Sequence, residues 1–126
     1  MGPKFIGILI LVAAMVVESF AQMFLKVGAA GGPGILQAPY RRLASGFPFS
    51  SIAASWVALG VIAYGLEIAL YTFALHLLDV SVAFPMGSLC FVGVALLSKL
   101  FLGETVGRIR WLGVGCIVLG AVFVAL

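Results

Sequence analysis

Four long apolar runs make up most of the chain, and charged residues mark their ends. The runs cover residues 5–27, 51–78, 80–102 and 109–126. A membrane-spanning helix takes about 20 mostly apolar residues, and a backbone at bilayer depth must form its hydrogen bonds within its own segment. The pattern therefore predicts an all-α membrane protein, a single four-transmembrane-helix bundle over residues 1–126, with one sizeable loop at residues 28–50.

The composition supports this prediction. Of the 126 residues, 64% are hydrophobic and only 9% are charged, whereas soluble domains are about half apolar and a quarter charged. Four spans leave no room for a separate soluble catalytic domain. The first run is longer than the apolar core of a signal peptide and contains Glu18 and Gln22, so we expect it to be a retained helix.

The basic residues predict the orientation of the chain. With four spans, Lys4 lies on one side of the membrane, and six cations lie on the other: Lys26, Arg41, Arg42, Lys99, Arg108 and Arg110. Cytoplasmic loops carry the excess of lysine and arginine, so we expect both termini outside the cytoplasm. This strong bias disfavours an antiparallel homodimer, which needs a chain that inserts both ways round.

The loop at residues 28–50 allows two interpretations. Apolar residues at near-helical spacing would form one face of a helix, and polar residues would form the opposite face, which favours a short helix on the membrane surface. The apolar residues are Ile35, Leu36, Tyr40 and Leu43, and the polar ones are Gln37, Arg41 and Arg42. Pro39 lies in the middle of this pattern, so an irregular polar loop is the equal alternative.

Polar residues inside the spans are few, and ionisable groups at bilayer depth are functional candidates. Glu18 and Gln22 share one face of the first span, and Glu67 and Tyr71 share a face of the second. We expect these four residues to couple protons or substrate. Counting along the helices places Glu67 roughly 10 Å nearer the outer surface than Glu18. The alternative is that the carboxyls only hold helices together.

Two further sets of residues have predicted roles. Lys26, Arg41, Arg42 and Lys99 lie at the level of the lipid head groups, where we expect them to bind an anionic group such as the phosphate of a lipid substrate, although topology control explains the same cations. Gly113, Cys116 and Gly120 form a smooth face on the last span for close helix packing. Cys90 and Cys116 fit neither a disulfide framework nor a metal site.

Enzyme motifs are missing from the sequence. It contains no glycine-rich phosphate loop, no metal-binding histidine pair and no combination of acid, base and nucleophile. We therefore predict that the protein is not an enzyme, uses no metal or other cofactor and binds no nucleic acid.

The second half of the chain resembles the drug/metabolite transporter superfamily. The resemblance covers SVAFPMGSLCFVGVALLSKLFLGETVGRIRWLGVGCIVLGAVFV, including the turn at Gly103 and Glu104. Its most specific part, Pro85, Met86, Ser88 and Leu89, is similar to the four-helix subunits that flip undecaprenyl-phosphate-linked aminoarabinose; Ala21 and Gln22 of the first run add to that similarity. The resemblance implies a multi-pass protein of the bacterial inner membrane that flips a polyprenyl-phosphate-linked sugar or related anionic lipid.

The chain also resembles the small multidrug resistance transporters. Glu18 stands eight residues before Lys26, as the essential glutamate of that family stands before a lysine. Gly87 replaces the tryptophan with which that family holds cations. This resemblance implies an alternative function, a proton-coupled exporter of small cationic or amphipathic compounds. In either case four helices enclose too little space for a substrate path, so we expect a second small subunit or a dimer. An accessory subunit without transport activity is a third possibility.

Overall fold

The computed structural model describes residues 2–46 and 52–126, and all regular elements within these ranges are helices. In chain order they are α1 (Pro3–Ala29), the short 3₁₀ helix η1 (Pro33–Ile35), α2 (Ala38–Ser45), α3 (Ala53–Leu75), α4 (Val80–Gly87), α5 (Cys90–Phe101) and α6 (Arg108–Ala125). Four segments are long and apolar enough to cross a membrane: α1, α3, α4 with α5, and α6. The prediction of an all-α membrane protein with four such segments is confirmed. The predicted start of the second span, and loop residues 47–50, lie outside the described residues.

The third apolar run is not one helix, as the sequence pattern indicated, but two. Pro85 and Gly87 weaken the helix there, because proline lacks an N–H group and glycine has a low helix propensity. The Ser88 hydroxyl donates to the Pro85 carbonyl over 2.5 Å, and the amides of Ser88 and Leu89 bond three residues back rather than four. The backbone therefore breaks between α4 and α5 at bilayer depth, which is tolerated where it is buried in protein or lines a cavity.

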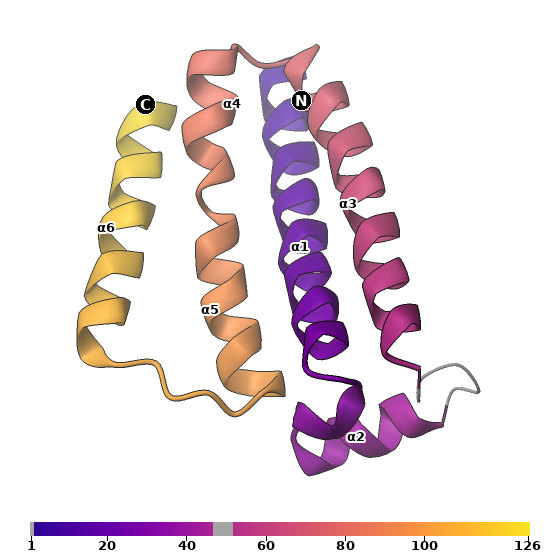
Figure 1. Cartoon of the computed structure of the whole chain (residues 1–126). Coiled ribbons are helices and arrows are strands. Elements are labelled where there is room, and N and C mark those ends of the chain that lie inside the picture. Colours follow the sequence, from indigo (N-terminus) through magenta and orange to yellow (C-terminus); the bar gives the residue numbers. More distant parts are fainter. Residues whose placement is uncertain (1, 47–51) are drawn as a thin grey trace.

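Helices α1 and α3 form the tightest pair, and they run antiparallel (Figure 1). Glycines allow the close approach. A Cβ atom placed on Gly28 would lie 2.6 Å from Cγ2 of Val57, and one placed on Gly60 would lie 2.8 Å from Cγ of Leu25. At the other end, Gly7 packs in the same way against Leu78. These contacts fix the register of the pair.

The spans stand in the order α3, α1, α4 with α5, and α6, so α6 forms one edge (Figure 1). Both termini lie at one end of the molecule; α2 and the connection from α5 to α6 lie at the other. We call the latter the basic end, because it carries Lys26, Arg41, Arg42, Lys99, Arg108 and Arg110. In α6 only Ala121 is buried by this chain, so this edge offers its surface to lipid or to another protein.

The segment between α1 and α3 contains a helix, α2, which was one of the two interpretations of the loop. Pro39 lies in its first turn, where proline is tolerated, rather than in its middle. The segment also packs on the helix ends. The backbone N–H of Gln37 donates to the Phe101 carbonyl over 2.9 Å. The ring centres of Tyr40 and Phe101 are 4.3 Å apart. It therefore covers the basic end of α5.

Candidate functional site

A cavity of about 310 Å³ lies at the break between α4 and α5, where α1 and α3 face it. We call it the acid cavity. Its lining residues are Met15, Glu18, Glu67, Tyr71, Phe84, Gly87, Ser88, Cys90 and Phe91. The structure thus brings three of the four predicted coupling residues, Glu18, Glu67 and Tyr71, into one space. Irregular helices at mid-membrane are where transporters place their substrate sites.

The two acids lie at the same depth, and the prediction that Glu67 is nearer the outer surface is wrong. Glu18 is eleven residues from Gly7, and Glu67 is eleven residues from Leu78, the partner of Gly7. At the other end, Glu18 is ten residues from Gly28, and Glu67 is ten residues from Val57, the partner of Gly28. The packing register of α1 and α3, which depends on contacts between glycines and side chains, decides the depth of both groups.

The environment of Glu67 is unusual for a carboxyl. Its side chain is only 9% exposed, whereas Glu18 is half-buried. Within residues 2–46 and 52–126, no hydrogen-bond donor reaches Glu67, and no lysine, arginine or histidine lines the acid cavity. A charge buried without a partner is strongly unfavourable. No side-chain nitrogen or oxygen that is fully buried among the described residues lacks a hydrogen-bond partner, so the carboxyl oxygens of Glu67 open into the acid cavity.

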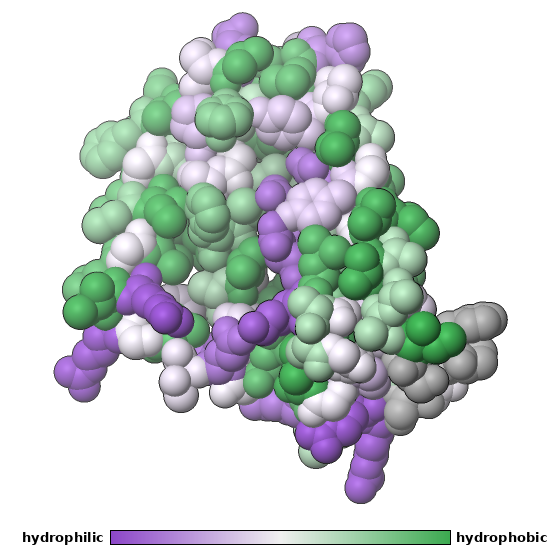
Figure 2. Space-filling model, viewed as in Figure 1, coloured by the Kyte–Doolittle hydropathy of each residue, from purple (hydrophilic) through white to green (hydrophobic). Residues whose placement is uncertain are grey.

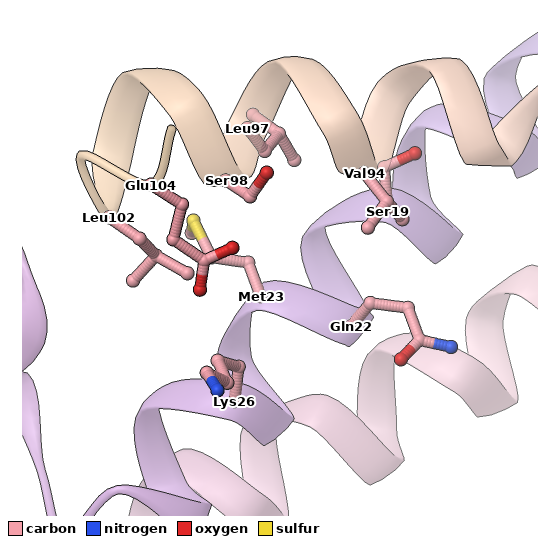
Figure 3. Close-up of a pocket in the computed structure, with 9 residues that line it drawn as sticks. All are labelled: Ser19, Gln22, Met23, Lys26, Val94, Leu97, Ser98, Leu102 and Glu104. Atoms are coloured by element: carbon pink, nitrogen blue, oxygen red, sulfur yellow. The ribbon is translucent and has the colours of Figure 1, made fainter. Parts of the chain in front are cut away.

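A second cavity, of about 250 Å³, lies between α1 and α5 towards the basic end. We call it the lysine cavity (Figure 3). Its lining residues are Ser19, Gln22, Met23, Lys26, Val94, Leu97, Ser98, Leu102 and Glu104. In Figure 3 the Glu104 side chain extends towards α1, the helix that carries Lys26. One cation and one anion thus face the same small space.

Gln22 connects the two cavities. It lines the lysine cavity, and its amide nitrogen donates to the hydroxyl of Tyr64 on α3. Tyr64 lies one helical turn from Glu67, and Gln22 lies one turn from Glu18. Figure 2 shows the result as a column of hydrophilic side chains at mid-height, along the line where α4 and α5 meet α1.

An apolar groove of about 240 Å³ adjoins both cavities. Its lining comes from α1, α5 and α6 and from the turn before α5: Val12, Met15, Val16, Ser19, Leu89, Val92, Gly93, Leu96 and Val118. Met15 is shared with the acid cavity and Ser19 with the lysine cavity. The buried Ser19 hydroxyl donates to the carbonyls of Met15, at 2.8 Å, and Cys90, at 3.3 Å. These bonds join α1 to α5 between the three spaces.

The four predicted phosphate-binding residues do not converge on one site. Lys26 lines the lysine cavity, whereas the Lys99 ammonium lies 5.5 Å from the centre of the Trp111 ring. The guanidinium of Arg41 donates to the Leu36 carbonyl at 3.1 and 3.3 Å, and Arg42 follows it on α2. All four are exposed at the basic end. They form a cationic rim there, within which Lys26 is the residue that lines the lysine cavity.

The predicted packing face on α6 is open in this chain. Gly113, Cys116 and Gly120 are exposed, and a Cβ atom on either glycine would meet nothing within 4 Å. No other described helix of the chain uses this face, so it is available to a neighbour.

Comparison with known proteins decides the family. The sequence profile of the EamA-like transporter family matches residues 5–126, which is nearly the whole chain. The chain belongs to the EamA-like transporter family. This membership agrees with the predicted resemblance to drug/metabolite transporters, and together with the four apolar segments it supports a multi-pass membrane protein.

This EamA-like chain is also similar to individual curated proteins. It is 43% identical over 65 residues to the probable 4-amino-4-deoxy-L-arabinose-phosphoundecaprenol flippase subunit ArnE of Yersinia pseudotuberculosis. The aligned residues cover 52% of this chain and 57% of that protein. The corresponding protein of Aeromonas hydrophila is 36% identical over 73 residues, covering 58% of this chain and 64% of that protein. The similarity thus spans less than two thirds of the length of each relative. No solved structure matches.

Several residues of the EamA-like chain that line the cavities were not assigned to a site from the sequence, among them Glu104, Cys90 and Ser19. Glu104 was considered only as part of the Gly103-Glu104 turn, although it lines the lysine cavity. Cys90 was considered only as a cysteine outside any disulfide or metal site, although it lines the acid cavity. Ser19 was not singled out. Its position three residues before Gln22, on the same side of the first helix, was the available signal.

Proposed function

We propose that the protein is one subunit of a carrier that moves a polyprenyl-phosphate-linked sugar, or a related anionic lipid, across the bacterial inner membrane. The observation that carries this proposal is the apolar groove, which shares Met15 with the acid cavity and Ser19 with the lysine cavity. A lipid carrier needs an apolar path for the chain beside polar spaces for the head group. The similarity to subunits named as lipid-linked sugar flippases supports the same cargo.

The phosphate of such a lipid fits the basic end. Lys26 points a cation into a cavity at the level where helix ends meet the head groups, and Gln22 and Ser98 add hydrogen-bonding groups there. The other cations of the rim, Arg41, Arg42 and Lys99, attract anionic lipids. Each basic residue near the membrane surface contributes about 1 kcal/mol to that attraction. Lys26 is therefore the residue that we assign to phosphate contact, with the rim as a collecting surface.

A second subunit completes the path. Helix α6 buries little surface within this chain, and its small-residue face is open. Small residues let membrane helices approach closely, and related transporters surround their sites with two oppositely oriented halves. Because the cations are strongly biased to one end, we propose a different small membrane protein as the partner rather than an antiparallel copy.

Crosslinking tests the subunit proposal. With Cys90 replaced by serine, Cys116 becomes the single thiol, and it lies on the open face. A thiol-specific crosslinker in native membranes should join Cys116 to a different small membrane protein. Abundant homodimers crosslinked through Cys116 would contradict the heteromeric assembly.

Lipid movement tests the cargo. Inside-out membrane vesicles from cells with and without the chain are compared for the fraction of polyprenyl-phosphate-linked sugar that an impermeant reagent modifies. The carrier should move the head group into the vesicle lumen and lower that fraction over time. Equal time courses in both vesicle types would contradict the proposal.

A proton-coupled exporter of small cationic or amphipathic compounds is the second candidate function. The acid cavity favours it, because two carboxyls and several aromatic rings face one space without a basic side chain among the described lining residues. Export of a cationic dye by whole cells, lost on deletion of the chain while the lipid time courses stay equal, would select this function.

A further inference from the structure

We infer that Glu104 makes the lysine cavity selective for a phosphodiester over a phosphate monoester. A polyprenyl-phosphate-linked sugar is a phosphodiester with a single negative charge, whereas the bare polyprenyl phosphate is a monoester whose charge at neutral pH is about −1.5 to −2. A carrier with this preference takes up the loaded lipid and rejects the empty one. The selectivity rests on the proposed function, because it requires a lipid phosphate as the cargo.

The turn after α5 places Glu104 at the lysine cavity. Gly103 has a φ of +67°, in the left-handed region that glycine adopts without strain. The backbone N–H of Glu104 donates to the Ser98 carbonyl over 3.2 Å. The Gln37 side chain lies against the turn, since a Cβ atom on Gly103 would lie 2.6 Å from Nε2 of Gln37. The turn is thus held by α5 and by the residue before α2, and the Glu104 side chain extends from it towards α1 (Figure 3).

Glu104 is the only acidic residue at the basic end. The chain has four acidic residues. Glu18 and Glu67 line the acid cavity, and Asp79 precedes α4 at the opposite end of the molecule (Figure 1). Glu104 therefore lies among the cations of the basic end, and it lines the same cavity as Lys26. Its carboxylate faces the space that we assign to the phosphate.

The charges of the lysine cavity suit a guest with one negative charge. Lys26 and Glu104 are the charged members of its described lining, so the lining has no net charge. No ion pair joins these two side chains within the described part of the chain, so both can act on a guest between them. The first negative charge of a phosphate is offset by Lys26, whereas a second one is repelled by the carboxylate.

Solvent limits the size of this preference. Lys26 and Glu104 are both exposed, so water and salt screen the repulsion. A carboxylate about 6 Å from the extra charge, at an effective dielectric constant of about 40–80, lowers the affinity for the monoester roughly threefold to tenfold. The rim has the opposite effect, because cations attract the more highly charged lipid more strongly. Selection of the diester therefore needs an acid within the cavity.

Binding of a matched pair of lipids tests the inference. The full chain in nanodiscs of a zwitterionic lipid is titrated at neutral pH with polyprenyl phosphate and with its methyl ester, which has the same chain but is a diester. Displacement of a fluorescent polyprenyl phosphate gives both affinities. We expect the diester to bind about threefold to tenfold more tightly, and the ratio of the two affinities to shrink as salt is added. Equal affinities, or tighter binding of the monoester, would overturn the inference.

Variants then assign the preference to Glu104. Glu104→Gln should remove or reverse it, because a neutral amide does not repel the second charge. Glu104→Asp keeps the carboxylate and should still prefer the diester. The control, Asp79→Asn, removes an acid at the opposite end and should bind like the unmodified chain. A purely structural role of Glu104 would weaken both lipids equally, so an unchanged ratio of affinities in Glu104→Gln would also overturn the inference.

The binding ratio and the movement of lipid in vesicles fail separately. If the vesicles move the lipid-linked sugar but the chain does not distinguish diester from monoester, the selectivity fails and the flippase proposal stands. If the chain prefers the diester through Glu104 but no lipid moves, the selective site stands and the flippase proposal fails.

Discussion

The acid cavity and the lysine cavity lie on the same helix, α1, yet they handle charge in opposite ways. In the acid cavity, two carboxyls lie well inside the apolar helices α1 and α3, and Glu67 is almost completely buried. In the lysine cavity, one cation and one anion, Lys26 and Glu104, are both exposed near the helix ends. Depth and the presence of an opposite charge distinguish the two.

The difference shows which group of a cargo each cavity suits. An exposed cation among head groups can attract a phosphate without being buried. The acid cavity, which has two carboxyls and no basic residue among its described lining residues, suits a group that donates hydrogen bonds or carries positive charge. Gln22, bonded to Tyr64, lies between them, so a head group that moved from one cavity to the other would pass this bond. Three variants test how far the cavities depend on each other.

The largest effect is expected at Gly93, where α5 touches α1 between the cavities. A Cβ atom there would overlap the side chain of Ser19. Gly93→Ala should therefore push α5 away, break the Ser19 bond to Cys90 and lower the free energy of unfolding by about 1–3 kcal/mol. Circular dichroism during denaturation in mixed micelles measures the change.

The control for this variant is Gly65→Ala, because a Cβ atom on Gly65 would meet nothing within 4 Å. Its stability should stay equal or rise slightly, since alanine is the better helix former. If both alanine variants were equally stable, the close contact of α1 with α5 would not hold the cavities together.

A smaller effect is expected at Lys26. Lys26→Gln should weaken binding of a polyprenyl phosphate about tenfold, since a charged hydrogen bond is lost, and leave binding of a neutral lipid unchanged. The matched control, Lys4→Gln, removes a lysine near the other end of α1 and should bind both ligands normally. Fluorescence titration with labelled lipid in nanodiscs provides the measurement. Equal losses for both ligands would show that Lys26 only anchors the end of its helix.

The smallest effect is expected at Tyr64. Tyr64→Phe keeps the ring but removes the hydroxyl that accepts the Gln22 bond. The loss should be about 1 kcal/mol of stability, with faster lipid movement in vesicles if the bond restricts passage between the cavities. Unchanged stability together with an unchanged rate would mean that the bond neither supports the fold nor restricts the path.

Much of the fold was predictable from the sequence. Hydrophobic length identified the four apolar segments, because bilayer thickness sets a minimum run for a helix. The break after Pro85 was not predicted, since hydropathy is continuous across it and only the local hydrogen bonds of Ser88 and Leu89 reveal it. The helix at residues 38–45 remained one of two alternatives because Pro39 was assigned to its interior rather than to its first turn.

The site was predictable in its residue types but not in its grouping. Glu18 and Glu67 were recognised as rare acids within apolar runs, and the structure places them in one cavity. Their common depth depends on contacts such as Gly28 with Val57, which a single sequence does not encode in any periodicity. The basic residues show the converse case. Their sequence positions did not show that, among Lys26, Arg41, Arg42 and Lys99, it is Lys26 that lines the lysine cavity of the described residues.

Native mass spectrometry of the gently purified protein tests the central claim most directly. If the chain carries a polyprenyl-phosphate-linked sugar, the spectrum should show protein with one retained lipid whose fragments include a polyprenyl phosphate, and the Lys26→Gln variant should lose most of that species. The Lys4→Gln variant should retain it. Spectra that contain only bulk phospholipids, equal in all three proteins, would contradict the account.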